Sequence, residues 1–211
     1  MSSPFDVLAP SYEATWSNTP DGRGQRTEVW NVIDDLFQPG DRILDLGCGI
    51  GDDAIHLREG GVNVWGIDSS QEMAEISRAR GVEAHWRWME DLSTVPGNLS
   101  GALSNFGALN CVTRLETIAE QLGRLVVPGG PIALCVMGRF CWRESAKFLL
   151  QGKFAKAARR WRGHAVWRGT PIRYWSEREM RSAFGPHFEF EKRVPVGRGD
   201  HQLYVFRRRA S

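Results

Sequence analysis

The stretch RILDLGCGIGDDAIHLR, residues 42–58, decides how the rest of the chain is interpreted. Residues 42–46 are mainly apolar and are typical of a short buried strand. The glycine-rich segment 47–51 predicts a tight loop, and residues 52–58 predict a helix that opens on two acids, where the helix dipole favours negative charge. This order of strand, glycine loop and helix N-terminus lets the backbone approach a bound ligand closely.

A second acid follows at the distance expected for a nucleoside site. Val62 to Ile67 predicts another strand, which leads into Asp68, and Asp68 lies 21 residues after Gly47. An acid about 20 residues beyond such a loop can accept both hydroxyls of a ribose. The pattern therefore indicates a cofactor that contains adenosine.

The charges around the loop favour a cationic cofactor over a dinucleotide. The dinucleotide fingerprint has its third glycine one position after Gly51, where Asp52 stands here. Asp45, Asp52 and Asp53 would repel a pyrophosphate, but not a sulfonium that also carries an ammonium group. The alternative role for Asp45 and Asp68 is that of capping acids.

Strands and helices alternate along most of the chain, and Ser176 and Glu179 form a capping box. This alternation predicts one α/β domain over residues 1–211, with a mainly parallel sheet and helices on both faces. An irregular or partly helical arm is expected over residues 1–27. Helices are expected over 27–37, 52–58, 70–81, 115–126 and 176–184, and strands over 42–46, 62–67, 82–88, 102–106, 131–137, 188–196 and 202–208.

The charge is unevenly divided. The 211 residues include 27 Lys and Arg against 25 Asp and Glu, a formal charge of +2, which excludes a strongly basic nucleic-acid coat protein. Residues 137–175 contain ten Lys or Arg and one acid, so this segment carries +9 and the rest of the chain carries −7. A basic segment on an acidic body needs its own explanation.

The cysteines and the hydropathy point to an ordinary cytoplasmic protein. None of the four cysteines is part of a CxxC motif or of a cluster with zinc-like spacing, so no metal site is expected. No leader peptide precedes the fold, and no apolar run approaches the roughly 18 residues that span a bilayer. We therefore expect a cytoplasmic location with reduced thiols.

Three motifs in order resemble those of class I S-adenosylmethionine (SAM)-dependent methyltransferases. They are ILDLGCGIG at 43–51, VWGIDSS at 64–70 and LVVPGG at 125–130. The similarity is greatest to the small-molecule branch that includes ubiquinone-biosynthesis methyltransferases. It implies a Rossmann-like seven-stranded sheet in the order 3-2-1-4-5-7-6 with the last strand antiparallel. It also implies SAM as cofactor and S-adenosylhomocysteine as product.

The resemblance also implies roles for individual residues. In this family pattern Asp45, Gly47, Cys48 and Gly49 surround the methionine part of the cofactor, with Cys48 contributing its backbone. Asp68 holds the ribose and Ser69 lies beside the adenine. The remaining implied cofactor contacts are Met89, Glu90, Ser104 and Asn105, and in the N-terminal arm Tyr12 and Arg26.

Two of these assignments have alternatives in the residues themselves. Glu90 could equally belong to a solvated loop, and Trp88 replaces the first acid of the family's motif. The aromatic side chains of the arm, including Tyr12, could simply pack the arm. Arg26 is expected to pair with the methionine carboxylate.

Residues 138–175 form an insert after the fifth strand, which resembles a lid over the substrate pocket. A small hairpin about Gly169 is expected within it. Its basic face could be a solvated helix surface, a site for an acidic or aromatic small-molecule substrate, or a peripheral membrane contact. No nucleic-acid partner is expected. The substrate candidates are Asn110, Trp142, Arg173 and Tyr174.

Methyl transfer from a sulfonium is an in-line displacement, so a base is needed only when the acceptor must lose a proton. His164 in the insert and His201 in the terminal hairpin turn are the candidates for such a base. The acceptor atom is not specified by the sequence. The alternatives are a lipid-like or quinone substrate at a membrane surface, and a catalytically silent SAM-binding sensor.

Overall fold

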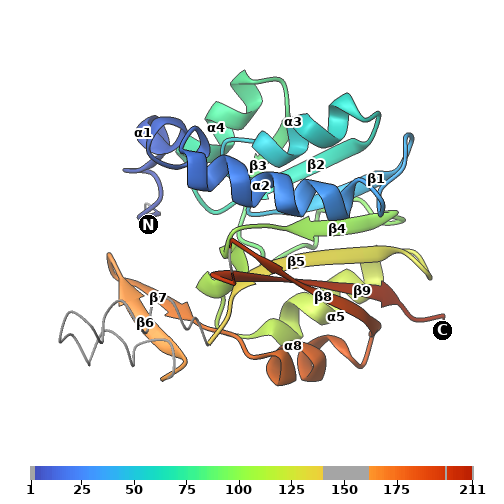
Figure 1. Cartoon of the computed structure of the whole chain (residues 1–211). Coiled ribbons are helices and arrows are strands. Elements are labelled where there is room, and N and C mark those ends of the chain that lie inside the picture. The colour runs from blue at the N-terminus through green and yellow to red at the C-terminus, as the bar shows by residue number, and fades with distance from the viewer. Residues whose placement is uncertain (1–2, 140–161, 198, 211) are drawn as a thin grey trace.

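A seven-stranded sheet forms the centre of the molecule in the computed structural model, which describes residues 3–139, 162–197 and 199–210 (Figure 1). The strand order is β3-β2-β1-β4-β5-β9-β8, and β9 runs antiparallel to β5 and β8. This confirms the predicted order and the antiparallel last strand. The strands are β1 (Arg42–Leu46), β2 (Asn63–Asp68), β3 (Glu83–Trp86), β4 (Gly101–Ser104), β5 (Pro131–Met137), β8 (Phe188–Val196) and β9 (His201–Arg208).

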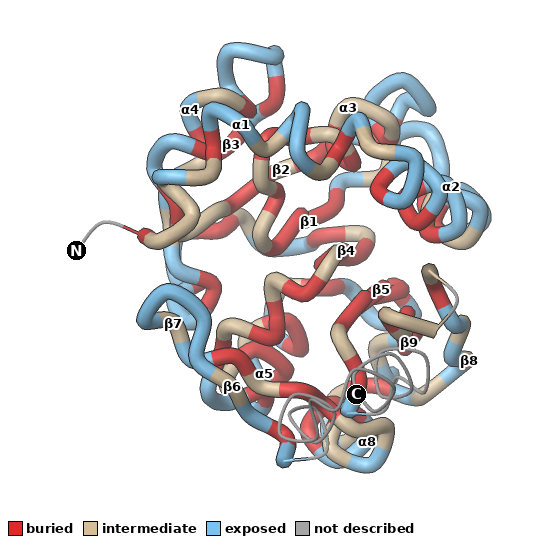
Figure 2. Tube along the Cα trace, turned by 60° about the vertical axis from the view of Figure 1, so that its left-hand side comes forward, coloured by how far each residue is buried: buried red, intermediate tan, exposed pale blue. Residues whose placement is uncertain are grey.

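The central strands are buried on both faces because helices cover each side of the sheet (Figure 2). Successive side chains point to opposite faces, so Ile43 packs in one core cluster and Leu44 in the other. The first cluster receives α2 (Pro20–Ile33) and α3 (Asp52–Glu59), and the second receives α5 (Leu115–Leu125) and α8 (Glu177–Phe184). The edge strand β8 instead alternates between exposed and partly buried residues.

The N-terminal boundary corrects the sequence prediction. The helix expected over 27–37 begins at Pro20 and ends at Ile33, so it starts inside the predicted arm 1–27. Thr19 caps it by accepting a hydrogen bond from the Gly22 amide, and proline is favoured in the first turn. Two glycines in the first half of this helix weaken the propensity signal there. The arm therefore ends at Thr19 and contains α1 (Ala9–Tyr12) and the π-helical turn η1 (Glu13–Ser17).

Two strands are also shorter than predicted. The strand expected over 82–88 ends at Trp86, and the strand expected over 102–106 ends at Ser104. Phe106 adopts a left-handed backbone conformation with φ of 45°, which no strand can continue. The capping box before α8 and the segment α4 (Gln71–Ala79) agree with prediction.

The predicted insert contains an antiparallel hairpin of β6 (His164–Trp167) and β7 (Thr170–Arg173), as expected about Gly169. Trp142 lies outside the described residues, as does most of the basic segment before the hairpin. Within the described ranges, the helices are too short or too polar to cross a bilayer.

Candidate functional site

The glycine loop folds tightly at the carboxyl ends of the parallel strands. The amides of Gly47 and Cys48 both donate to the Ile67 carbonyl, at 2.8 and 3.0 Å, so the loop is attached to the end of β2. Gly47 has a φ of 77°, and a Cβ there would lie 2.3 Å from the Ala108 Cβ. Only glycine fits this position, because both its conformation and the close approach of η2 (Ala108–Cys111) exclude a side chain.

The Asp68 carboxylate is fixed beside this loop. Its Oδ2 accepts the Gly49 amide at 2.9 Å, and its Oδ1 accepts the Ser70 amide at 2.8 Å. Burial raises the pKa of Asp68 to about 6, although the two backbone hydrogen bonds act in the opposite direction. The carboxylate is thus held in one orientation at the wall of a cavity.

That cavity is partly open to solvent, and its space, with the open solvent at its mouth included, is about 790 Å³. Its walls come from the glycine loop, the N-terminal arm, the ends of β2 and β4, and η2. It lies at the carboxyl edge of the sheet, where open α/β folds bind ligands. The structure brings nine of the predicted cofactor residues to its lining: Tyr12, Arg26, Gly47, Cys48, Gly49, Asp68, Ser69, Met89 and Asn105.

The other three predicted cofactor residues do not line the cavity. Ser104 is fully buried and its hydroxyl donates to the Leu46 carbonyl at 2.9 Å, so it holds β4 to β1. Glu90 is exposed and its side chain lies outside the cavity lining, which agrees with the solvated-loop alternative. Asp45 lies beneath the loop, 1% exposed, and its Oδ2 has no hydrogen-bond partner among the described residues. Burial raises the pKa of Asp45 well above its usual range.

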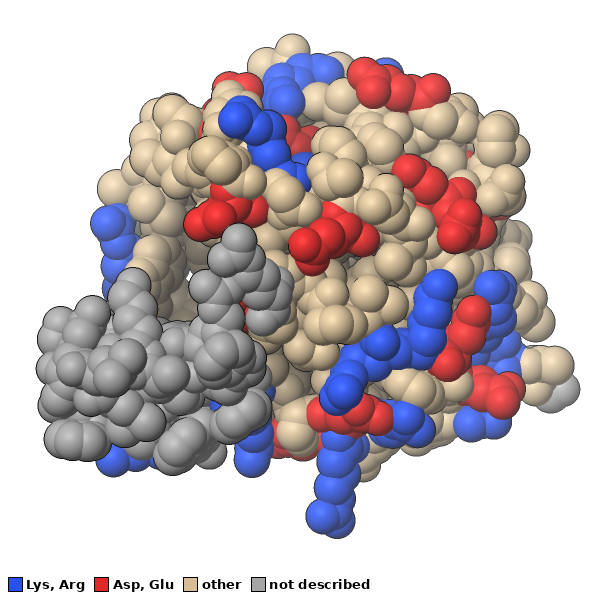
Figure 3. Space-filling view, in the orientation of Figure 1, with Lys and Arg blue, Asp and Glu red and all other residues tan. Residues whose placement is uncertain are grey.

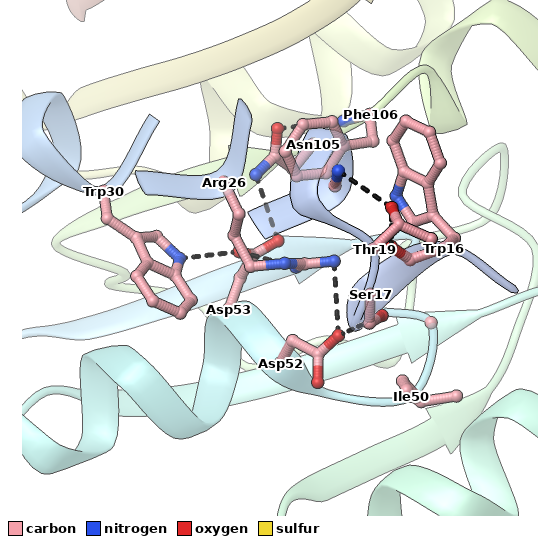
Figure 4. Close-up of polar contacts among 12 residues, drawn as sticks. Trp16, Ser17, Thr19, Arg26, Trp30, Ile50, Asp52, Asp53, Asn105 and Phe106 are labelled. Carbon is pink, nitrogen blue, oxygen red and sulfur yellow. Dashed lines mark hydrogen bonds and ion pairs between the residues drawn. The ribbon is translucent and has the colours of Figure 1, made fainter. Parts of the chain in front are cut away.

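A buried ion-pair network connects α2 to the start of α3 (Figure 4). The Arg26 guanidinium lies 2.9 Å from Asp53 Oδ1 and 3.2 Å from Asp52 Oδ2. Trp30 Nε1 donates to Asp53 Oδ1 at 2.8 Å, and Asn105 Nδ2 donates to Asp53 Oδ2 at 3.1 Å. Arg26, expected to pair with a ligand carboxylate, is therefore already held by two carboxylates of the protein.

The network shifts the pKa values of Arg26 and Asp52 toward their charged forms. Burial acts to lower the pKa of Arg26, but Asp53 and Asp52 outweigh it and raise that pKa. Burial acts to raise the pKa of Asp52, but the Ser17 hydroxyl, Arg26 and Arg80 together lower it. These directions favour the ionised forms of Arg26 and Asp52, so this ion pair is a fixed set of charges at one side of the cavity.

The N-terminal arm is attached across the cavity at two points. The Ser70 hydroxyl donates to Asp6 Oδ1 at 2.6 Å, and the Ser17 hydroxyl donates to Asp52 Oδ2 at 2.6 Å. Between these points Tyr12 enters the cavity wall, where burial raises its pKa to about 12. Its phenol is therefore neutral and can donate a hydrogen bond.

Several lining residues were not identified from the sequence. Phe5, Met73 and Cys111 are apolar or weakly polar and belong to no motif, and Ile50 lies within the glycine-loop motif but was given no role. Asp53 was interpreted as a dipole-favoured helix acid and as one of the three acids that disfavour a pyrophosphate, but it was not named as a residue of the cavity wall. Phe106 could have been found from its position after Asn105, at the carboxyl end of a central strand.

Phe106 anchors an aromatic group at the side of the cavity away from Asp68. Its ring lies 5.8 Å from that of His201 and 6.1 Å from that of Trp16, both edge-on. The Arg26 guanidinium lies 5.0 Å from the Phe106 ring centre. A non-glycine residue at positive φ in a cavity wall is a strained position of the kind that concentrates at functional sites.

The predicted substrate residues lie behind the cavity wall. Asn110 is fully buried, exchanges hydrogen bonds with the Met137 backbone at 2.9 and 2.8 Å, and also donates to the Arg173 carbonyl. It therefore joins the end of β5 to the hairpin. The Arg173 guanidinium donates to the Thr113 carbonyl at 3.2 Å and lies over the Trp175 ring. Tyr174 is buried beside them at 4% exposure.

The two histidine candidates are in different environments. His164 is exposed on the hairpin, and its Nδ1 lies 3.0 Å from the Arg162 carbonyl. His201 is buried at the turn between β8 and β9, which lies at the cavity end of the sheet because His201 pairs with Met137. Of the two, only His201 contacts a residue of the cavity lining.

The thiols near the cavity are poor nucleophiles. Burial raises the pKa of Cys111 to about 11 and that of Cys48 well above its usual range. A thiol of this kind is protonated at neutral pH and does not attack an electrophile readily. The described lining can therefore bind and orient, but it offers no activated cysteine.

Comparison with known proteins agrees with this geometry. Residues 24–191 match the family model of a methyltransferase domain. A demethylmenaquinone methyltransferase of Symbiobacterium thermophilum is 29% identical over 140 residues, 60% of this chain and 54% of that protein. A ubiquinone biosynthesis O-methyltransferase of Vibrio cholerae is 28% identical over 106 residues, 47% of this chain and 43% of that protein. The chain thus spans about half the length of these curated relatives.

A solved structure has the same fold at low sequence identity. It is the 1,6-didemethyltoxoflavin-N1-methyltransferase of Burkholderia thailandensis, with bound 1,6-didemethyltoxoflavin and S-adenosylhomocysteine. The match has a TM-score of 0.70 and 19% identity, and it covers 98% of this chain and 86% of that one. The family model covers most of the chain, including the glycine loop and Asp68. The chain therefore belongs to the methyltransferase domain family of enzymes, as the three sequence motifs predicted.

Proposed function

We propose that this protein transfers the methyl group of SAM to a small-molecule acceptor. The observation that carries the proposal is a glycine loop, tightly packed at Gly47, with a carboxylate fixed beside it. Gly49 and Asp68 are joined by a hydrogen bond of 2.9 Å, so loop and acid form one surface of the cavity. A ribose and the chain that extends from it fit such a surface.

The carboxyl groups of the site outnumber its arginines, which suits a cation. Asp45, Asp52, Asp53 and Asp68 lie in or beneath the cavity wall, against Arg26 and Arg80. The buried Asp45 Oδ2, which has no partner among the described residues, suits an ammonium group or a water bound to one. A bound SAM would supply a methyl group that is already activated by its sulfonium.

The chain's own residues would bind and align the reactants. Asp68 is proposed to accept the ribose hydroxyls, with Ser69 and Met89 beside the adenine. Tyr12 would close the cavity from the arm, and its neutral phenol would donate to the cofactor. Because in-line transfer depends mainly on alignment, a rigid wall of this kind is the main requirement for catalysis.

The acceptor is proposed to enter beside Phe106, Ala108 and Cys111. These side chains are apolar or uncharged, which favours a planar or apolar acceptor. A quinone-like or lipid-like acceptor is the second candidate, because the relatives include demethylmenaquinone and ubiquinone-biosynthesis methyltransferases. His201 behind Phe106 is the candidate base for an acceptor that must lose a proton.

Calorimetry with SAM and S-adenosylhomocysteine tests the cofactor, and transfer of a labelled methyl group to fractionated metabolite extracts tests the activity. We expect binding of both ligands and labelling of a small molecule. Absence of heat with either ligand would refute the cofactor assignment. Binding without labelled product in any fraction would argue against small-molecule transfer and favour a binding role.

A further inference from the structure

Exposed apolar side chains are concentrated around the cavity mouth. In the described part of the chain six large hydrophobic residues are exposed, and five of them lie at the carboxyl edge of the sheet. Val127 is the sixth and lies at the opposite edge, between α5 and β5. The five residues, which we call the rim, are Val7, Trp86, Trp88, Val166 and Trp167.

Three of the five rim residues are placed next to a residue of the cavity lining, and Val7 follows a residue that attaches the arm. Val7 follows Asp6, which bonds Ser70, and Trp86 Nε1 donates to the carbonyl of the lining residue Ser69 at 3.1 Å. Trp88 precedes the lining residue Met89. Trp167 contacts the lining residue Phe5 with ring centres 5.4 Å apart. The rim therefore extends over the arm, the end of β3 and the hairpin.

The rim projects from separate segments and does not form one groove. Val7 and Val166 are each 74% exposed, and Trp86 and Trp88 are each 53% exposed. Tryptophan rings that stand on loops and turns insert singly into the interfacial region of a bilayer, where the ring is buried and its N–H stays hydrated. A protein partner would need a contiguous complementary patch.

The charge of the hairpin complements an anionic surface. Residues 162–175 contain Arg162, Arg168 and Arg173 and no acid. Elsewhere the charges interleave: over β8, Arg193 pairs with Glu177 and Arg207 with Glu191 (Figure 3). Glu90 and Asp91 follow Trp88, so the attraction is concentrated on the hairpin side of the rim.

We propose that the rim docks the cavity mouth onto an anionic lipid bilayer, from which an apolar acceptor enters the site. The proposal rests on the proposed function, because methyl transfer to an apolar acceptor would require a cavity mouth that docks onto a bilayer. The hairpin arginines would attract the surface, and the rim side chains would enter it. The bilayer would then supply an acceptor that is too apolar to dissolve.

Co-sedimentation of the full chain with vesicles tests this proposal. The vesicles are phosphatidylcholine alone, and phosphatidylcholine mixed with phosphatidylserine. We expect the wild type to sediment with the mixed vesicles at low salt and to be released by high salt. Failure to sediment with the mixed vesicles would overturn the proposal.

The variants Trp88→Ser and Val166→Ser remove rim side chains that lie outside the cavity lining. Together they should lower vesicle binding about tenfold or more, since each loses apolar area that would leave water. Val127→Ser is the matched control and should bind like the wild type. Equal binding by the double variant, or binding reduced equally by Val127→Ser, would overturn the proposal.

A second pair of variants tests the charge. Arg168→Gln should weaken binding to the mixed vesicles several-fold, whereas Arg124→Gln, an exposed arginine on α5, should not. A rim that mediates self-association instead would give dimers that Trp88→Ser dissociates, and this result would overturn the bilayer assignment. SAM calorimetry on the same samples separates the two proposals. A wild type that binds SAM but does not bind the mixed vesicles would refute the rim proposal alone.

Discussion

The glycine-loop end of the cavity and its hairpin end are held by different kinds of contact. At the first, Arg26, Asp52 and Asp53 form buried ion pairs, and backbone amides fix Asp68. At the second end, Asn110 donates to the Met137 carbonyl and Trp175 Nε1 donates to the Leu109 carbonyl. These hydrogen bonds hold only the base of the hairpin. The tip of the hairpin reaches the arm through the ring contact of Trp167 with Phe5.

This difference suits the two reactants. A cofactor of constant shape is best bound by a rigid, preorganised surface, since less freedom is lost on binding. An acceptor site that closes through a few side chains can adapt to a different molecule with few substitutions. We therefore expect substitutions at the glycine-loop end to affect stability and cofactor binding together, and substitutions at the hairpin end to affect mainly the acceptor.

The largest effect should come from Gly47→Ala. The new Cβ would meet the Ala108 Cβ at 2.3 Å in a backbone conformation with φ of 77°. We expect a loss of about 4 kcal/mol in the free energy of unfolding, together with loss of SAM binding. Denaturant titration and calorimetry measure the two effects.

Gly49→Ala is the matched control for this clash. Gly49 also has a positive φ, 54°, but a Cβ there would have no atom within 4 Å. It should therefore cost only about 1–2 kcal/mol, the cost of the conformation alone. Equal losses of unfolding free energy in Gly47→Ala and Gly49→Ala would show that the close approach of Ala108 does not exclude a side chain at position 47.

The buried network should give the next largest effect. Arg26→Ala leaves Asp52 and Asp53 buried without their cation, and we expect a loss of about 3 kcal/mol in unfolding free energy. Arg124→Ala removes an exposed ion pair with Glu120 and should change the free energy of unfolding by less than about 0.5 kcal/mol. Similar losses for both variants, measured by urea unfolding, would contradict the contrast between the buried and exposed pairs.

Asp68→Asn should separate stability from function. The folded pKa of Asp68 is raised from 3.8 to about 6, so the folded state holds its proton more tightly than the unfolded state does. That contribution to stability is complete below about pH 4 and is lost as the pH rises through about 6. At neutral pH the variant avoids this cost, but its single amide oxygen can accept only one of the two backbone N–H groups, so its free energy of unfolding should exceed that of the wild type by less than about 2 kcal/mol.

The same substitution should weaken SAM binding by roughly 1.5–3 kcal/mol at neutral pH, because the charged hydrogen bonds to ribose are lost. Binding by the wild type should weaken as the pH falls below about 6, and binding by the variant should not follow that profile. Asp91→Asn, at an exposed aspartate that follows the neighbouring strand β3, is the control and should leave both quantities unchanged. A pH profile shared by wild type and Asp68→Asn would assign the titration to another group.

The sequence predicted the glycine-loop end better than the hairpin end for a physical reason. Gly47, Gly49 and Asp68 act through backbone geometry that a short, ordered motif specifies, and all three line the cavity as expected. Asn110 was predicted to contact substrate, yet it joins segments that are distant in the chain. Such long-range pairing leaves no periodicity in the sequence, and neither does the left-handed turn that places Phe106 in the wall.

The smallest effect should come from the contact that connects the two ends. The Trp167 and Phe5 rings lie 5.4 Å apart and tilted by 36°, and Trp167 keeps 38% of its surface exposed. Their coupling in a double-mutant cycle of Trp167→Ala and Phe5→Ala should be about 0.5–1 kcal/mol. Hydrogen exchange of the arm amides measures this coupling energy as a change in local opening of the arm. Global unfolding experiments would not detect such local opening. If the arm opens equally in wild type and Trp167→Ala, the hairpin does not stabilise the arm, and the two ends of the cavity close independently. If opening increases, the hairpin stabilises the arm that carries Tyr12, and SAM affinity should fall together with a rise in the acceptor KM.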